Sequence, residues 1–472
     1  MTATDSLSTG AAPPDRMRRP GWFLPLLRRV HFFAGLLVGP FILVAALSGA
    51  LYALTPTLEK AMYAHELTAS TTRTGTPLAD QISAAEAYVG GGTPVAVRPA
   101  PAPGDTTRVM FADDSLPEST TRAVFVDPAT TEIRGDLPAY GTSGALPLRH
   151  WISDLHRSLH LGDVGRWYSE LAASWLGIVA LAGLGLWVAR VAVQRRHRRR
   201  AARPARGYRR LSGWHSGLGV GVVIGALFLS ATGITWSTYA GAHVADLRAV
   251  VGGATPALMT SIDGSSGGDD HAHHGGAHEA PTTADTSGFD DVLALARTAD
   301  VDSRDVEIRP PAGDGMAWVV QEVHRSFPTE VDAVAIDAET MRVSDRVDFD
   351  DYPLLAKLSR WGVDLHMGTM FGLANQIVLF VLAIGIAALV VLGYAMWWKR
   401  RPTRGLATAP ARGVLRHAPW WGTAAVLAAA VAIGLMLPLV GFTLAAFVVV
   451  DVLLGWRARR SATAARGEVD AR

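Results

Sequence analysis

The sequence contains no cysteine among its 472 residues. This absence excludes disulfide bonds, thiolate-bound zinc, iron–sulfur clusters and a thiol nucleophile. Any bound metal or cofactor must therefore use histidine, methionine or oxygen ligands.

The short motifs of several enzyme classes are also missing. The chain has no phosphate-binding loop, no glycine-rich dinucleotide fingerprint after a strand, no His-Glu-x-x-His and no Gly-x-Ser-x-Gly. An ATP-driven pump and a nicotinamide-dependent reductase domain therefore have no support. The segments expected in the cytoplasm are too short for a flavin domain.

Charged residues are scarce at 18%, whereas hydrophobic residues make up 49% and the mean hydropathy is +0.21. A chain this apolar is not an ordinary soluble enzyme, and membrane spans are expected. The net charge is only +2, but the basic residues gather beside the apolar runs, most densely at 195–200. The pI of about 9.0 therefore reflects membrane orientation better than nucleic-acid binding.

The apolar runs predict six membrane spans with both termini in the cytoplasm. The first run, Val30 to Leu54, is long enough for a retained anchor instead of a cleaved signal peptide. The expected fold is mainly α, with a duplicated four-helix transmembrane core, a C-terminal two-helix hairpin and two small α+β modules outside the membrane. The expected segments are a disordered tail (1–29), span one (30–54), the first module (55–149), an outer histidine segment with span two (150–193), a basic loop (194–213), span three (214–238), the second module (239–360) with a histidine-rich insertion (263–288), a second outer histidine segment with span four (361–398), a cytoplasmic loop (399–417), the hairpin (418–456) and a cytoplasmic tail (457–472).

Two parts of the chain repeat each other at a spacing of 210 residues. The motif that ends in His156 recurs as Asp-Leu-His366, and the acidic turn at Asp127 recurs at Asp337, since 366 − 156 and 337 − 127 are both 210. A helical pattern and short β-rich runs precede each histidine motif. Each copy is therefore expected to contain one helix with a short antiparallel sheet, a histidine at the membrane edge and a span.

Spans one and three repeat each other as well, and each begins with a histidine. An ionisable residue near the bilayer is costly unless it is partnered, so His31 and His215, which occupy equivalent positions, are functional candidates. Small residues on one face of these spans allow close helix packing, and they also leave room for a flat macrocycle. The residues that follow at identical offsets are Gly35 and Gly219, Ser48-Gly49 and Thr232-Gly233, and Tyr52 and Trp236.

The four histidines form two layers, with His31 and His215 at the cytoplasmic end and His156 and His366 at the outer end. Two imidazoles from facing helices can ligate one haem iron axially. The pattern therefore predicts two b-type haems, each held by a histidine pair. The alternative for each histidine is a hydrogen-bonded interfacial residue without a cofactor.

His160 is a second candidate for the outer ligand, because on a continuous helix it would lie one turn beyond His156. The repeat favours His156, since the position equivalent to His160 is occupied by Met370. Asp154 and Asp364 stand two residues before the outer histidines. Helix capping is their expected role, with orientation of the imidazoles as the alternative.

A histidine-rich stretch in the second module is the remaining candidate site. Its Gly, Ser and Asp residues predict a disordered loop, and its imidazoles can chelate Cu(II), Ni(II) or Zn(II). A solvated insertion without a role explains the composition equally well. The candidate metal ligands are His271, His273, His274 and His278.

The order of these motifs resembles the PepSY-associated transmembrane family, whose members are also described as iron-regulated membrane proteins. The resemblance covers roughly Arg28 to Arg401 and includes two PepSY-like modules. Its motifs are the His31 and His215 spans that end in Ser-Gly and Thr-Gly, Leu155-His156-Arg157-Ser158-Leu159 with Gly162 and Gly165-Arg166, and Leu365-His366 with Gly368.

Some members of this family are haem-containing inner-membrane reductases of ferric siderophores. The resemblance implies electron transfer to an external ferric chelate, from a donor on the cytoplasmic or quinone side. Reduction releases the metal because hard oxygen ligands hold Fe(III) more tightly than Fe(II). Position alone suggests Arg157 or Trp151 as a docking place. The hairpin and the histidine-rich stretch depart from the family pattern, and the latter favours copper or another ion as an alternative substrate metal.

Two other functions stay open at this point. A non-catalytic regulator would only display its modules outside the membrane, and it would be colourless where a haem reductase absorbs visible light. A metal transporter would need paired polar groups within its spans, and these spans carry few, chiefly Asn375-Gln376 and Asp451.

Overall fold

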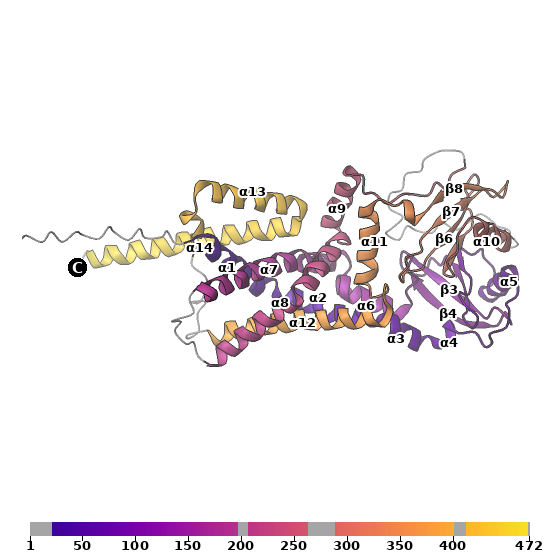
Figure 1. The fold of residues 1–472 in the computed structure, drawn as a ribbon, viewed down its shortest axis with the longest axis horizontal. Coiled ribbons are helices and arrows are strands. Elements are labelled where there is room, and N and C mark those ends of the chain that lie inside the picture. Colours follow the sequence, from indigo (N-terminus) through magenta and orange to yellow (C-terminus); the bar gives the residue numbers. More distant parts are fainter. Residues whose placement is uncertain (1–20, 197–205, 263–287, 401–411, 471–472) are drawn as a thin grey trace, which may run out of the picture.

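The computed structural model describes residues 21–196, 206–262, 288–400 and 412–470. The molecule is elongated, with a bundle of long helices at one end and a β-sheet with its helices at the other (Figure 1). Short helices lie at the junction between the two parts. This layout separates an apolar half from a half rich in strands.

Among the described residues, four helices are each long and apolar enough to cross a membrane. They are α7 (Gly162–Arg196), α8 (Arg206–Thr235), α12 (Gly372–Lys399) and α14 (Pro438–Asp470). A fifth span results if α1 (Phe23–Leu37) and α2 (Gly39–Ala53), which are bent by 62° at their junction, count as one. The chain is thus a multi-pass membrane protein.

The six predicted spans are not all matched. Helix α13 (Trp420–Met436) has 17 residues and falls short of the length of the other spans. The first span is broken because Pro40 stands in the first turn of α2, where it has no N–H to donate to the preceding turn.

The bundle is held by small residues and by a few polar contacts. Gly177 faces Ser230, whose hydroxyl donates to the Ala173 carbonyl at 2.6 Å. The Tyr394 hydroxyl donates to the Leu36 carbonyl at 2.6 Å and so ties α12 to α1. Such contacts matter in a bilayer, where helix association relies on close packing and interhelical hydrogen bonds.

The C-terminal hairpin of α13 and α14 lies along one side of the bundle (Figure 1). Trp175 on α7 donates its indole N–H to the Thr443 hydroxyl at 3.0 Å. About two turns further along α14, Arg29 and Asp451 form an ion pair at 2.6 Å. Asp451, which stood out in the sequence as a polar residue within a span, therefore anchors the hairpin to α1.

At the other end, one sheet of eight antiparallel strands has the order β4-β3-β2-β1-β5-β6-β7-β8. Two separate small modules were expected, but strands β1 and β5 join the two halves into one sheet through the Val97–Ile308 pair. Residues of α5 (Leu78–Val89) and α10 (Gly288–Thr298) pack into one shared core on the sheet. The strands are β1 (Ala96–Arg98), β2 (Thr107–Phe111), β3 (Thr120–Val126), β4 (Ile133–Tyr140), β5 (Val306–Arg309), β6 (Trp318–Glu322), β7 (Ala333–Ile336) and β8 (Val343–Val347).

The two halves of the sheet use the same local interactions. The Asp127 carboxylate accepts the N–H groups two and three residues later, at 2.9 and 3.3 Å. The Asp337 carboxylate does the same at 2.8 and 3.2 Å. Both turns therefore close through an aspartate that bonds to its own backbone.

Five short helices connect the bundle to the sheet (Figure 1). Glu170 on α7 fixes one of them, because its carboxylate accepts the N–H groups of Tyr239 and Ala240 at 3.0 and 3.1 Å. These helices are α3 (Thr55–Met62), α4 (Ala64–Leu67), α6 (Pro147–Ser158), α9 (Tyr239–Val250) and α11 (Leu354–His366), and two 3₁₀ turns lie at Phe349–Asp351 and Val414–His417.

Candidate functional site

Two histidines face each other inside the bundle, at the end remote from the sheet. His31 on α1 and His215 on α8 have ring centroids 6.1 Å apart, and their planes meet at 75°. We call them the far pair. The sequence placed them at equivalent positions, and the fold brings them together.

Each ring of the far pair lies against a backbone carbonyl and a glycine of a neighbouring span. The Nδ1 atom of His31 lies 3.0 Å from the Val179 carbonyl, and a methyl group added at Gly183 would lie 2.9 Å from the ring. His215 meets the equivalent groups on α12, the Leu389 carbonyl and Gly393. Its contact is looser, since His215 Nδ1 is buried without a well-formed hydrogen bond to any described residue.

The other two histidines lie at the sheet side of the bundle, and we call them the near pair. The Nδ1 atom of His156 on α6 lies 3.0 Å from the Ser48 hydroxyl. The Nδ1 atom of His366 on α11 lies 2.6 Å from the Thr232 hydroxyl. Ser48 and Thr232 are separated by 184 residues, as are His31 and His215, so the two contacts occupy equivalent positions.

The two hydroxyls lie on the Nδ1 side of the near pair. Each oxygen also lies 2.8 Å from a carbonyl of its own helix, that of Val44 for Ser48 and that of Phe228 for Thr232. When a hydroxyl gives its one hydrogen to the carbonyl, its oxygen accepts from Nδ1–H of the imidazole. That tautomer has its lone pair on Nε2, which is the atom left to bind a metal.

The surroundings keep the near pair neutral. Burial lowers the pKa of His156 to about 4. Burial and, to a smaller extent, the neighbouring His156 lower the pKa of His366 to about 4. Near neutral pH both imidazoles are uncharged, which is the state in which histidine binds metals.

His160 and the two aspartates differ from expectation. Helix α6 ends at Ser158, and Leu159 and His160 have positive φ angles of 53° and 57°, so His160 doesn't continue the face of His156. His160 is exposed and packs against Trp151 at 4.9 Å between ring centroids. The equivalent residue, Met370, is buried.

Asp154 and Asp364 neither cap their helices nor bind the histidines. Both lie in the last turns of α6 and α11, far from the N-termini that an aspartate caps. Asp154 pairs instead with His150 at 3.2 Å and with Arg157 at 2.8 Å. Arg157, one of the two suggested docking residues, also donates to the Tyr140 hydroxyl at 3.1 Å, while Trp151 is exposed.

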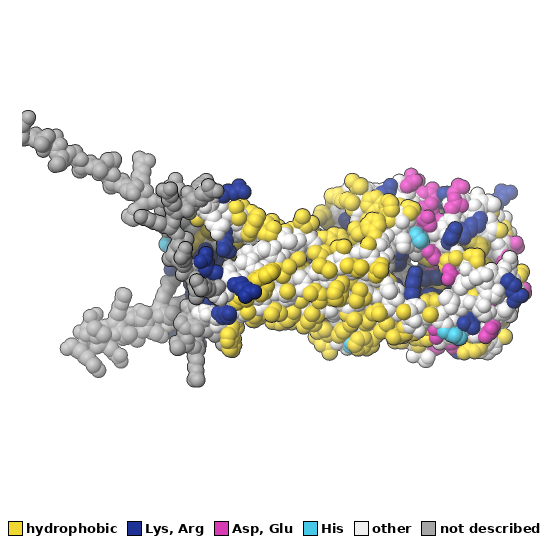
Figure 2. Space-filling model, turned by 60° about the horizontal axis from the view of Figure 1, so that its bottom comes forward, with side chains coloured by type: hydrophobic (Ala, Val, Ile, Leu, Met, Phe, Trp, Pro, Cys, Tyr) yellow, Lys and Arg dark blue, Asp and Glu magenta, His cyan; other side chains and the backbone are white. Residues whose placement is uncertain are grey.

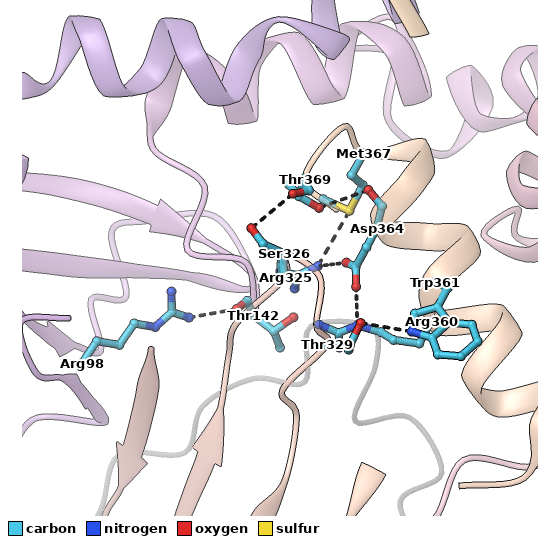
Figure 3. A network of polar contacts seen from close by, with 10 residues as sticks. All are labelled: Arg98, Thr142, Arg325, Ser326, Thr329, Arg360, Trp361, Asp364, Met367 and Thr369. Atoms are coloured by element: carbon cyan, nitrogen blue, oxygen red, sulfur yellow. Dashed lines mark hydrogen bonds and ion pairs between the residues drawn. The ribbon is translucent and has the colours of Figure 1, made fainter. Parts of the chain in front are cut away.

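The equivalent Asp364 is completely buried between two arginines. Its carboxylate accepts from Arg360 at 2.7 Å and pairs with Arg325 at 3.5 Å (Figure 3). Arg360 and Asp364 are four residues apart on one helix, a spacing at which opposite charges pair, so the sequence could have revealed this contact. Arg325 gave no such signal, because it comes from the loop after β6, some 40 residues away.

The histidine-rich candidates His271, His273, His274 and His278 lie outside the described residues. Within the described ranges, no three His, Asp or Glu side chains cluster closely enough to hold a metal ion. The histidine pairs have two imidazoles each, fewer than the three or four protein ligands of a zinc site.

A family model described as the PepSY-associated TM region matches residues 28–400, nearly the range over which the sequence resembled that family. A search of curated proteins finds no match. Since the matched range covers most of the 472 residues, the chain belongs to the family of PepSY-associated transmembrane proteins.

Proposed function

We propose that the protein is a haem-containing membrane reductase, which passes electrons across the membrane to a ferric chelate on the outside. The observation that supports it best is the pair of histidine layers, each with its imidazoles in equivalent environments. The recurrence of these contacts at spacings of 184 and 210 residues also supports an internal duplication of the four-helix core and of the two PepSY-like modules.

The far pair fits a bis-histidine haem. Two imidazoles from facing helices would hold one haem iron. The centroids of His31 and His215 are 6.1 Å apart. Glycines at 183 and 393 bring the neighbouring helices close to the rings. The near pair fits through its free Nε2 atoms, and we assign one b-type haem to each pair.

When bound, such haems supply one-electron redox chemistry inside the bilayer. The chain's own residues prepare the sites for them. The Val179 carbonyl and the Ser48 and Thr232 hydroxyls orient the rings and increase the basicity of the ligating nitrogens. Apolar side chains of the spans surround the far pair, and low polarity around a haem influences its reduction potential.

The proposed substrate is a ferric siderophore or a related chelate outside the cell. The near pair lies next to the junction with the sheet, where a soluble chelate can approach. Conversion of Fe(III) to Fe(II) weakens its bonds to hard oxygen ligands, and this releases the metal. The far pair would accept electrons from a donor on the cytoplasmic side or from a membrane quinol.

The test is the visible spectrum of the purified protein together with single substitutions. We expect haem bands in a reduced-minus-oxidised spectrum and a ratio of two haems to one chain. His31→Ala or His215→Ala should remove one haem, and His156→Ala or His366→Ala the other. His160→Ala serves as the matched control, because its exposed ring lies outside both pairs.

Two outcomes would contradict the proposal. A colourless protein would favour a regulatory role for the PepSY-like modules. If the histidines are only structural, each substitution would remove a buried hydrogen bond, lower the free energy of unfolding by about 1–3 kcal/mol and leave the visible spectrum unchanged. Reduction of an external ferric chelate that survives loss of the near pair would show that electrons do not leave through it.

A further inference from the structure

Three arginines meet at the junction between the bundle and the sheet, next to the near pair. Arg149 lies on α6, Arg325 on the loop after β6 and Arg360 on α11. The charges of Arg149 and Arg360 both act on Arg325. We call these residues the arginine cluster. Figure 3 shows Arg325 and Arg360 directed at the same carboxylate, that of Asp364.

The arginine cluster has more positive charge than its carboxylates can balance. Asp364 is shared, at 2.7 Å from Arg360 and 3.5 Å from Arg325. The other side-chain contact of Arg325 is weak, at 3.8 Å to the sulfur of Met367. Burial, together with the charges of Arg360 and Arg149, lowers the pKa of Arg325 to about 10, as expected for a cation among cations.

Arg149 is the least satisfied member. It is 6% exposed, and its Nε and Nη2 atoms have no hydrogen-bond partner within the described part of the chain. Among the carboxylates, Glu59 has the largest effect on the charge of Arg149. Burial raises the pKa of Glu59, however, and its carboxylate already accepts the Leu146 N–H at 2.9 Å. Buried guanidinium nitrogens without acceptors are costly, and a bound anion would satisfy both their hydrogen bonds and their charge.

The arginine cluster is also within reach of both the near pair and solvent. Arg149 lies beside Tyr52, whose ring stacks on His156 with centroids 6.2 Å apart. The side chains of Arg325 and Arg360 remain 20% and 22% exposed. Figure 2 shows basic side chains in a hollow between the hydrophobic band and the strand-rich end of the molecule. The arginine cluster therefore adjoins the near pair through Arg149 and is partly open to solvent through Arg325 and Arg360.

We propose that the arginine cluster is a binding site for carboxylate groups. Guanidinium groups bind carboxylates through two parallel hydrogen bonds, and the free Nε and Nη2 of Arg149 lie on the edge that makes them. The carboxylates have two possible sources. One is the propionate groups of a haem on the near pair, which rests on the proposed function. The other is a polycarboxylate metal chelate that enters through the hollow.

Citrate binding to the full-length protein in detergent tests the site and separates the sources. Calorimetry at pH 7 and constant ionic strength would be run on the protein as purified and again after haem extraction. Binding in both states indicates an external carboxylate. Binding only after extraction indicates that haem propionates fill the site. Both results support carboxylate recognition, and absence of binding in both states overturns it.

Arg325→Gln connects the binding to the arginine cluster. Loss of its charged hydrogen bonds should weaken citrate binding about tenfold. Arg342→Gln is the matched control, because it removes one charge from an exposed position in the same half of the sheet. If Arg325→Gln does not fold, Arg325→Lys keeps the charge but loses the two-pronged geometry, and it should bind citrate less tightly than the wild type. Equal affinity in a folded Arg325 variant and the wild type overturns the assignment.

The outcome doesn't depend on the reductase proposal. A colourless protein would end the haem assignment, yet citrate binding that requires Arg325 would still establish the anion site. If the protein carries two haems, a further readout is their ratio to protein. Arg325→Gln should then lower the content of the near haem only where propionates are the ligand.

Discussion

At the scale of single residues, the informative contacts are those of two hydroxyls with two imidazoles. Ser48 and Thr232 lie 3.0 and 2.6 Å from Nδ1 of His156 and His366, and each also lies 2.8 Å from a carbonyl of its own helix. The sequence revealed all four residues through repeats, at a spacing of 184 residues for the hydroxyls and 210 for the histidines. It could not reveal which hydroxyl meets which imidazole, since that depends on how α2 packs on α6 and α8 on α11.

The first prediction concerns these hydroxyls. Ser48→Ala and Thr232→Val remove the hydroxyl that contacts Nδ1, and the ring then loses its fixed orientation. We expect the affinity for the near haem to fall roughly 10–100-fold, as for other residues that orient metal ligands. The haem-to-protein ratio after washing with apomyoglobin measures this loss.

Thr235→Val provides the control, because the Thr235 hydroxyl donates only within its own helix, to the Thr232 carbonyl at 2.7 Å. Full retention of both haems in Ser48→Ala and Thr232→Val would mean that the hydroxyls do not orient the ligands.

His160 shows a limit of prediction from spacing at this scale. Its spacing from His156 suggested a shared helix face, and two residues with positive φ ended the helix before it.

At the scale of elements, the contact between β1 and β5 holds the two halves of the sheet together. The two strands are short and pair at Val97 and Ile308. Glu307 reinforces them, because its buried carboxylate lies 2.6 Å from both Arg98 and Arg309. Each half was predictable from helix and strand patterns, but this union was not. A three-residue strand leaves no signal that tells which edge it will pair with.

The second prediction concerns this ion-pair group. Burial alone would raise the pKa of Glu307, but the charges of Arg98 and Arg309 hold it at about 2. The pKa of Glu307 in the folded state lies below its unfolded value of about 4.5. The ionised carboxylate therefore stabilises the fold above pH 4.5, and this contribution disappears as the pH falls towards 2. The pKa shift corresponds to about 3 kcal/mol in the free energy of unfolding at neutral pH.

Glu307→Gln should therefore lower the thermal midpoint of the sheet at pH 7, and the difference from the wild type should shrink between pH 4.5 and 2. Intrinsic tryptophan fluorescence follows this unfolding, since Trp318 lies in the shared core. Glu339→Gln, at an exposed position, is the comparison that should leave the midpoint unchanged. A pH-independent effect of Glu307→Gln would assign its cost to packing instead of charge.

At the scale of the whole molecule, prediction from the sequence was most reliable where long apolar runs determine the structure. Four spans and the paired histidines follow from hydropathy and spacing. The break within the first span and the short α13 depend on Pro40 and on helix length. The arginine cluster was not predictable, because Arg149, Arg325 and Arg360 come from segments that only the fold of both halves brings together.

The last prediction is the orientation of the molecule in the membrane. Basic side chains gather at the end of the bundle remote from the sheet (Figure 2), as at the ends of α7 and α12, where Arg195 and Lys399 lie. Basic residues flanking spans remain in the cytoplasm. The sheet should therefore lie outside, with the near pair on the outer side of the bilayer and the far pair on the inner side.

Reporter insertions measure this orientation directly. Alkaline phosphatase, which is active only outside the cytoplasm, should be active when inserted at Ala112 or Asp314, two exposed positions in opposite halves of the sheet. A fluorescent protein that matures only in the cytoplasm should be bright when fused after the C-terminal residue. The reverse pattern would place the sheet and the near pair inside the cell. Electrons that left through the near pair could then not reach an external chelate, although the histidine pairs could still hold haem. The topology experiment thus tests the direction of electron flow independently of the cofactor.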